Sequence, residues 1–113
     1  MIIGRTQKIF IIQPDTDLEI LAKVDSGSYS SSIDKSLFES LNLSVDSHKS
    51  KIVKSSHGQT QREFYWLDII VKGVKITTEL NIQDRSNLKY KFLLGRKDIS
   101  QLDALVNVKL KDD

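Results

Sequence analysis

The 113-residue sequence predicts a single all-β domain, built as a barrel or a sandwich. Short runs rich in branched and aromatic residues recur along the chain, with turn-forming residues between them. Residues 74–82 alternate apolar with polar or small residues, a pattern typical of a strand with one buried face. Helical spacing is limited to two short segments, residues 34–41 and 96–102. This order of elements does not fit the strand–helix alternation of a parallel α/β fold.

The first third of the chain contains two predicted strands and one predicted helix. Residues 8–12 and 18–24 read as strands, and the Pro-Asp-Thr-Asp sequence of residues 14–17 reads as the turn between them. Asp34 is the expected N-cap of the helix over residues 34–41, because an Asp side chain accepts a hydrogen bond from the first helical turn.

The middle of the chain predicts a long β-hairpin. Residues 51–55 and 61–71 form its expected strands, with Gly58 at the tip. The Lys-Gly pair at residues 72–73 predicts a tight turn into the alternating strand over residues 74–82.

The last third predicts a buried strand, a helix and a final half-buried strand. Residues 90–94 are nearly all apolar, and residues 96–102 follow as a short helix with Asp98 near its start. Apolar residues alternate through residues 104–110, which predicts a strand. The chain thus has six or seven expected strands and two short helices.

Charge and hydropathy argue against two classes of partner. Lys and Arg number 17 and Asp and Glu number 15, so the net charge is +2, and no run of five basic residues occurs. Such a weak field gives no reason to expect nucleic-acid binding. No apolar run reaches membrane-spanning length, and the N-terminus lacks a secretory signal. We therefore expect a cytoplasmic protein without a membrane partner.

The residue types that are absent exclude several chemistries. The chain has no cysteine, which excludes disulfides, thiolate zinc sites and cysteine nucleophiles. The two histidines, His48 and His57, form no His-Glu-x-x-His motif, so we predict no metal site. No phosphate-binding loop and no Gly-x-Ser-x-Gly elbow are present. We therefore expect neither a cofactor nor a serine nucleophile.

One acidic turn is the best candidate for chemistry. The sequence Val24-Asp25-Ser26-Gly27-Ser28 follows the predicted strand over residues 18–24 and occurs once. Read alone, an Asp-Ser-Gly sequence is a common turn in which Asp caps its own backbone. A second motif, Leu93-Leu94-Gly95-Arg96, stands before the last predicted helix. The two motifs together make a catalytic carboxylate the stronger interpretation.

The order of these motifs resembles the retropepsin-like aspartic proteases. In that family an apolar-Asp-Thr/Ser-Gly turn is followed by a flap hairpin, then by an apolar-apolar-Gly-Arg segment, a helix and an interface strand. The sequence is similar in particular to a RimK-associated branch named for an ATP-dependent zinc protease. Four segments carry this resemblance: Ile3-Gly4-Arg5-Thr6, Lys23-Val24-Asp25-Ser26-Gly27, Ile52-Val53-Lys54-Ser55-Ser56-His57-Gly58 and Leu93-Leu94-Gly95-Arg96-Lys97.

The resemblance implies a closed retropepsin-like β-barrel with a flap hairpin, working as a homodimer. Such enzymes need two carboxylates that share one proton, and this chain supplies one, Asp25. Ser26 would then brace the opposing turn, and Gly27 would let substrate backbone approach. Many family members carry Thr and Ala where Ser26 and Ser28 stand here. The ends of the chain, residues 2–5 and 104–110, and the acidic turn itself would form the dimer contact.

The resemblance also implies substrate-binding and supporting residues. Substrate contacts would come from Ser28, Lys54, Ser55, Ser56, His57, Gly58 and Arg62, and support of the site from Leu94, Gly95 and Arg96. The polar flap with its basic Lys54 and Arg62 favours an acidic or polar peptide as substrate. Since RimK-type ATP-grasp ligases add glutamates to proteins, the expected activity is cleavage of glutamate-rich peptides.

Two other functions remain open at this point. The same fold can serve as a non-catalytic dimeric interaction module that regulates an ATP-grasp ligase. A weaker alternative is a small RNA-binding β-barrel in which Phe64, Tyr65 and Trp66 near Arg62 stack on bases. These aromatic residues are consecutive, so alternate rings point to opposite faces of a strand, and packing in the core is the better interpretation.

Overall fold

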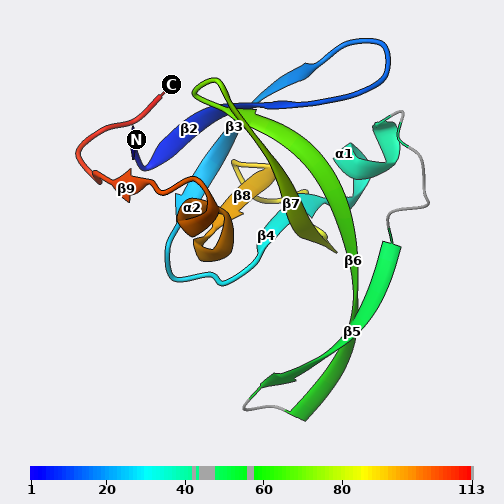
Figure 1. Ribbon diagram of the computed structural model, residues 1–113. Coiled ribbons are helices and arrows are strands. Elements are labelled where there is room, and N and C mark those ends of the chain that lie inside the picture. The colour runs from blue at the N-terminus through cyan, green and yellow to red at the C-terminus, as the bar shows by residue number, and fades with distance from the viewer. Residues whose placement is uncertain (42, 44–47, 56–57, 113) are drawn as a thin grey trace.

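The strands of the chain close into a barrel in the computed structural model, which describes residues 1–41, 43, 48–55 and 58–112 (Figure 1). For residues 48–55 and 59–63 it describes the backbone. The strands are β1 (Ile2–Ile3), β2 (Thr6–Ile11), β3 (Leu18–Asp25), β4 (Ser31–Asp34), β5 (His48–Ser55), β6 (Gly58–Val71), β7 (Val74–Gln83), β8 (Phe92–Gly95) and β9 (Leu105–Val106), and the helices are α1 (Lys35–Ser40) and α2 (Arg96–Gln101). The main sheet runs β2-β3-β8-β4-β7-β6-β5, and an additional β2–β6 pairing closes six strands into the barrel. The predicted all-β class with two short helices is confirmed.

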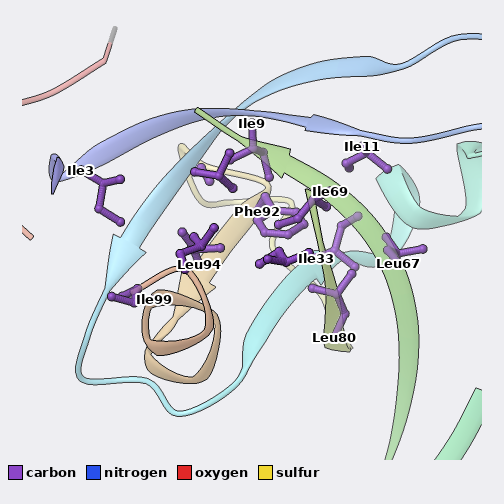
Figure 2. Close-up of a cluster of buried hydrophobic side chains, with 14 residues drawn as sticks. Ile3, Ile9, Ile11, Ile33, Leu67, Ile69, Leu80, Phe92, Leu94 and Ile99 are labelled. Atoms are coloured by element: carbon purple, nitrogen blue, oxygen red, sulfur yellow. The ribbon is translucent and has the colours of Figure 1, made fainter. Parts of the chain in front are cut away.

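Alternation along the strands fills the barrel with apolar side chains (Figure 2). The large side chains that are 0% exposed include Ile9, Ile11, Ile33, Ile69, Leu80, Phe92 and Leu94. Burying each contributes about 1.5–3 kcal/mol. If one strand slipped by one residue in register, all of its core side chains would point to solvent. The core therefore fixes the register of the strands.

Strand β4 lies in the middle of the sheet although its sequence, Ser-Ser-Ile-Asp, was not predicted as a strand. It pairs in parallel with β7 and antiparallel with β8. All four of its residues are buried. Sequence periodicity missed it because only one of the four residues is apolar, while Ser31 and Asp34 find hydrogen-bond partners that exist only in the folded barrel.

The end of β4 leads directly into the first helix. The Asp34 carboxylate accepts a hydrogen bond from the Leu37 backbone N–H at 3.3 Å, as expected of an N-cap. Its other oxygen accepts one from the Arg85 backbone N–H at 2.8 Å. Asp34 thus ties the loop after β7 to the start of α1. Within the described part of the chain, no helix has the length and apolar character needed to cross a membrane.

The predicted hairpin is present, and it projects away from the barrel (green in Figure 1). Its strands are longer than expected, because β5 starts at His48 and pairs with β6 throughout. Ser55 pairs with Gly58, so Gly58 is the first residue of β6, and its predicted place at the hairpin tip is wrong. Ser56 and His57 lie outside the described residues.

The final strand is shorter than the sequence predicts. The expected strand over residues 104–110 stops at Val106, because the chain then turns and the Leu110 N–H donates to the Asn107 carbonyl at 3.0 Å. Strand β9 pairs in parallel with β1 of the same chain. The tail continues past Gly4, where a Cβ would lie 2.5 Å from the Leu110 carbonyl oxygen. Only glycine permits this approach, which holds both chain ends together.

Candidate active site

The end of β3 presents Asp25 at the rim of the barrel. Both oxygens of its carboxylate are held locally: the Gly27 N–H donates to Oδ1 at 2.9 Å, and the Ser28 hydroxyl donates to Oδ2 at 3.2 Å. The Ser28 N–H also donates to the Asp25 carbonyl at 3.2 Å. Asp25 is half-buried, whereas Ser26 and Gly27 are exposed. The turn thus offers an oriented carboxylate that solvent and a ligand can reach.

The junction between β8 and α2 contacts this turn and supports it. Asp25 pairs with Gly95 in the sheet. The N–H of Arg96 donates to the Ser28 carbonyl at 2.6 Å, and the N–H of Lys97 donates to the Tyr29 carbonyl at 2.9 Å. These are first-turn N–H groups of α2, which have no partner within the helix. The structure therefore brings together the two motifs that are 70 residues apart in sequence.

The three residues predicted to support the site differ in their surroundings. Leu94 is fully buried in the barrel core. Gly95 lies so close to the turn that a Cβ would stand 2.5 Å from the Ser30 carbonyl carbon. The Arg96 guanidinium donates to the Ser26 carbonyl at 3.4 Å and lies 5.6 Å from the centre of the Tyr29 ring. Arg96 is exposed, so these contacts orient the turn without contributing much stability.

A buried acid that was not predicted as a site residue lies behind the turn. Asp98 is 2% exposed, and its Oδ2 accepts hydrogen bonds from the hydroxyls of Ser31, at 2.5 Å, and Thr78. Gln101 Nε2 donates to Oδ1 at 3.2 Å. The Ser31 hydroxyl oxygen in turn accepts from the Gly95 N–H at 2.9 Å. Asp98 therefore holds Gly95 in place through the Ser31 hydroxyl, and Gly95 is the residue that pairs with Asp25 in the sheet.

The sequence held one signal for this network. An acidic residue at the third position of a helix is a frequent capping residue, because it reaches back to the free N–H at the helix start. Here the Asp98 carboxylate reaches the Gly95 N–H through the Ser31 hydroxyl. Ser31 and Thr78 come from β4 and β7, so only the folded sheet reveals them as partners.

Burial raises the pKa of Asp98 above its usual 3.8, although hydrogen bonds from Ser31, Thr78 and Gln101 act in the opposite direction. The folded protein therefore binds this proton more tightly than the unfolded chain does. The stability that this group contributes is greatest below pH 3.8 and is lost as the pH rises through the raised pKa.

We expect Asp98→Asn to remove this dependence. The difference in free energy of unfolding, Asp98→Asn minus wild type, should grow as the pH rises from below 3.8 through the raised pKa. Urea unfolding at a series of pH values measures it. Asp103→Asn, at an exposed position, is the matched control and should follow the wild type. A constant difference across that pH range would show that Asp98 does not titrate with a raised pKa.

The predicted substrate-binding residues lie mainly in the projecting hairpin. Lys54 and Ser55 end β5, Gly58 begins β6, and Arg62 stands opposite Lys51 in the ladder. Their role in substrate binding stays a prediction, as does that of Ser56 and His57 outside the described residues. Ser28 is the exception, because its hydroxyl contacts the Asp25 carboxylate directly. Among the described side chains, no group of three His, Asp or Glu is arranged to hold a metal ion.

The barrel is similar in fold to retroviral proteases of known structure. No protein-family model matches the chain, and no curated protein does. Among solved structures, EIAV protease in complex with the inhibitor HBY-793 has a TM-score of 0.66 at 18% identity, covering 91% of each chain. Simian foamy virus protease has a TM-score of 0.58 at 22% identity, covering 87% of this chain and 94% of that chain.

A bacterial protein has the same architecture. Lpg0085 from Legionella pneumophila, a protein of unknown function, has a TM-score of 0.66 at 21% identity and covers 97% of this chain and 94% of its own. Sequence identities of 18–22% support a shared fold and nothing more specific. Together with the six-stranded barrel and the paired motifs at its rim, these similarities show that the chain has a retropepsin-like fold.

Proposed function

We propose that this chain is one subunit of a homodimeric aspartic peptidase whose active site contains Asp25 from each subunit. The observation that carries the proposal is the Asp25 carboxylate itself, held at the barrel rim by Gly27 and Ser28 beside two exposed residues. The retropepsin-like fold supports it, and in the proposed dimer the turns of two copies would face each other across a two-fold axis.

The proposed chemistry needs both copies of the carboxyl group. Two carboxyl groups about 3 Å apart share one proton, because both cannot stay ionised at that separation. The ionised group takes a proton from the attacking water, while the protonated group donates one to the oxygen of the scissile carbonyl. The leaving nitrogen is then protonated as the C–N bond breaks. One chain supplies only one of these groups, so the monomer is inactive.

Exposed apolar side chains near the chain ends support the proposed dimer contact. Ile2 is 51% exposed, Leu105 71%, Val108 66% and Leu110 48%. Ile2 and Leu105 are neighbours in the pairing of β1 with β9, and exposed apolar side chains of this kind are what a second copy would cover. Because β1 and β9 pair within one chain, two subunits would meet through these small sheets as preformed units.

The substrate class follows from the hairpin sequence. Lys54 and Arg62 give the hairpin a basic character, which favours acidic peptides through charge-assisted hydrogen bonds. We infer a glutamate-rich or otherwise acidic peptide as substrate and a functional link to a RimK-type ATP-grasp ligase, with the reaction itself requiring no cofactor.

Peptide hydrolysis by the purified protein tests this function. We expect cleavage of oligoglutamate-containing peptides in preference to neutral ones of the same length, detected by mass spectrometry. Specific activity should rise with protein concentration in the range where sedimentation shows monomer converting to dimer. Cleavage of neutral peptides alone would rule out the acidic preference. A dimer that binds these peptides and cleaves none would instead be a non-catalytic interaction module.

A further inference from the structure

A row of side chains crosses the sheet on the face that carries Asp25. Lys23 on β3 pairs with Leu93 on β8, and Leu93 pairs with Ser32 on β4. Ser32 pairs with Asn81 on β7, which pairs with Phe64 on β6. Side chains of residues paired in this way project from the same face of a sheet.

This face is opposite to the barrel core. Every buried apolar side chain of the described residues belongs to the one core cluster, except Leu93 and Phe64. Asp25 lies two residues after Lys23 on the same strand, so its side chain points to the same side as the row. The row of Leu93, Ser32, Asn81 and Phe64 is therefore the wall of the sheet that continues outward from the catalytic candidate.

Asn81 stands out in this wall. It is 6% exposed, and its Oδ1 is a fully buried oxygen without a hydrogen-bond partner, the one such side-chain atom among the described residues. Such an atom costs about 1–3 kcal/mol relative to a paired one. The neighbouring Ser32 is 3% exposed. A buried amide oxygen left unpaired, where an apolar residue would pack better, indicates a ligand that completes the hydrogen bonding of Asn81.

We propose that Asn81 and Ser32 form the polar end of a substrate subsite that takes a neutral carboxamide side chain, Gln or Asn, of the bound peptide. Leu93 and Phe64 would contact the aliphatic part of that side chain. This inference rests on the proposed peptidase function and adds to it the residue type that the site selects.

Hydrogen-bond complementarity favours a carboxamide over its competitors. An amide group supplies a donor for Asn81 Oδ1 and an acceptor for the Asn81 N–H or the Ser32 hydroxyl. A Glu side chain brings no donor when ionised, so it leaves Oδ1 unpaired and loses its hydration in a buried site. A Leu or Met side chain leaves Asn81 Oδ1 unpaired. Acidic residues of the substrate would instead face the basic hairpin.

The distance of Asn81 from Asp25 across the sheet determines which residue of the bound peptide can reach it. Three steps across the sheet separate β3 from β7, a distance of about 14 Å at the usual spacing of neighbouring strands. An extended peptide advances about 3.3–3.6 Å per residue, and a Gln side chain adds a few ångströms. The selected side chain therefore lies two or three residues from the scissile bond.

A peptide series that varies one position at a time tests the proposal. The peptides carry Gln, Glu, Leu or Met two or three residues to either side of the cleaved bond, and kcat/KM is measured for wild type, Asn81→Leu and Ser32→Ala. We expect wild type to prefer Gln over Leu at one of these positions by at least about tenfold, and Asn81→Leu to reverse the preference. Asn87→Leu, the same exchange in an exposed loop, should keep the wild-type order.

Two further measurements separate this inference from the peptidase function. Binding of reduced-amide versions of the peptides, which cannot be hydrolysed, should show the same Gln preference and its reversal. Without ligand, Asn81→Leu should melt above the wild type, since the unpaired oxygen is gone. Hydrolysis without a Gln preference, or with one that Asn81→Leu leaves unchanged, would overturn only this inference. Failure of the protein to bind or cleave any peptide would overturn the peptidase function and this subsite with it.

Discussion

Asp25→Asn is expected to lower kcat for peptide hydrolysis by at least about 1,000-fold. An amide cannot take a proton from water or hand one to the substrate, and proton transfer by a positioned side chain contributes 10²–10⁴-fold to such reactions. The fold should survive, because an Asn side chain keeps an oxygen for the Gly27 N–H and an NH₂ group for the Ser28 hydroxyl. Initial rates together with melting temperatures measure both effects. Asp17→Asn, on an exposed turn, is the control and should retain full activity.

Mixing wild-type and Asp25→Asn subunits tests whether the two subunits of a dimer share one active site. When Asp25→Asn protein is added in excess to wild type, heterodimers with one functional carboxyl group should form and hydrolysis should fall. Addition of Asp17→Asn protein should instead raise total activity. If Asp25→Asn protein had no effect on wild-type rates while sedimentation showed subunit exchange, each subunit would carry a complete site, and the proposed pair of Asp25 residues would be wrong.

Gly95→Ala is expected to cost at least about 3 kcal/mol of folding free energy. A Cβ at this position would stand 2.5 Å from the Ser30 carbonyl carbon and oxygen and 2.9 Å from the Ser31 nitrogen. These are backbone atoms of the turn and of β4, so they cannot move aside as a flexible side chain would. Overpacking of a well-fitted interior costs about 1–3 kcal/mol. Loss of the bond from the Gly95 N–H to the Ser31 hydroxyl adds to it.

Urea unfolding measures this loss, and Gly73→Ala is the matched control. Gly73 has a φ of 79° and no atom within 4 Å of an added Cβ. The same substitution there should cost only about 1 kcal/mol, from backbone conformation alone. Equal losses at the two positions would show that close packing of Gly95 against the turn is not what requires glycine.

The strands with alternating or continuous apolar residues were predictable because burial dictates their pattern. Residues 74–82 were expected as a half-buried strand and form most of β7, and the run before Gly95 was expected as a buried strand and forms β8. The last predicted strand fails after Val106, where alternation continues in sequence but the chain turns back over Gly4. Alternation alone cannot distinguish a strand from a tail that lies across another segment.

The candidate site was predictable in part. The Asp-Ser-Gly turn and the Leu-Leu-Gly-Arg segment carry their own local signals, a tight turn and a strand end before a helix. Asn81 carries none that separates it from ordinary polar residues, and the signal of Asp98 is limited to its place in the first turn of the predicted helix. Their significance depends on burial and on partners from other strands, which sequence spacing does not reveal.

By itself, the sequence determined the strands that have a clear apolar pattern, where the acidic turn lies, and that each chain supplies one such turn, because these follow from local pattern and composition. Only the tertiary structure decided that the Gly95 segment lies against that turn. It also decided that Asp98 anchors the segment through Ser31, and that Asn81 lies on the face of the sheet that carries Asp25. The physical reason is the order of the strands: β3, β8, β4 and β7 are neighbours in the sheet although they are far apart in the chain.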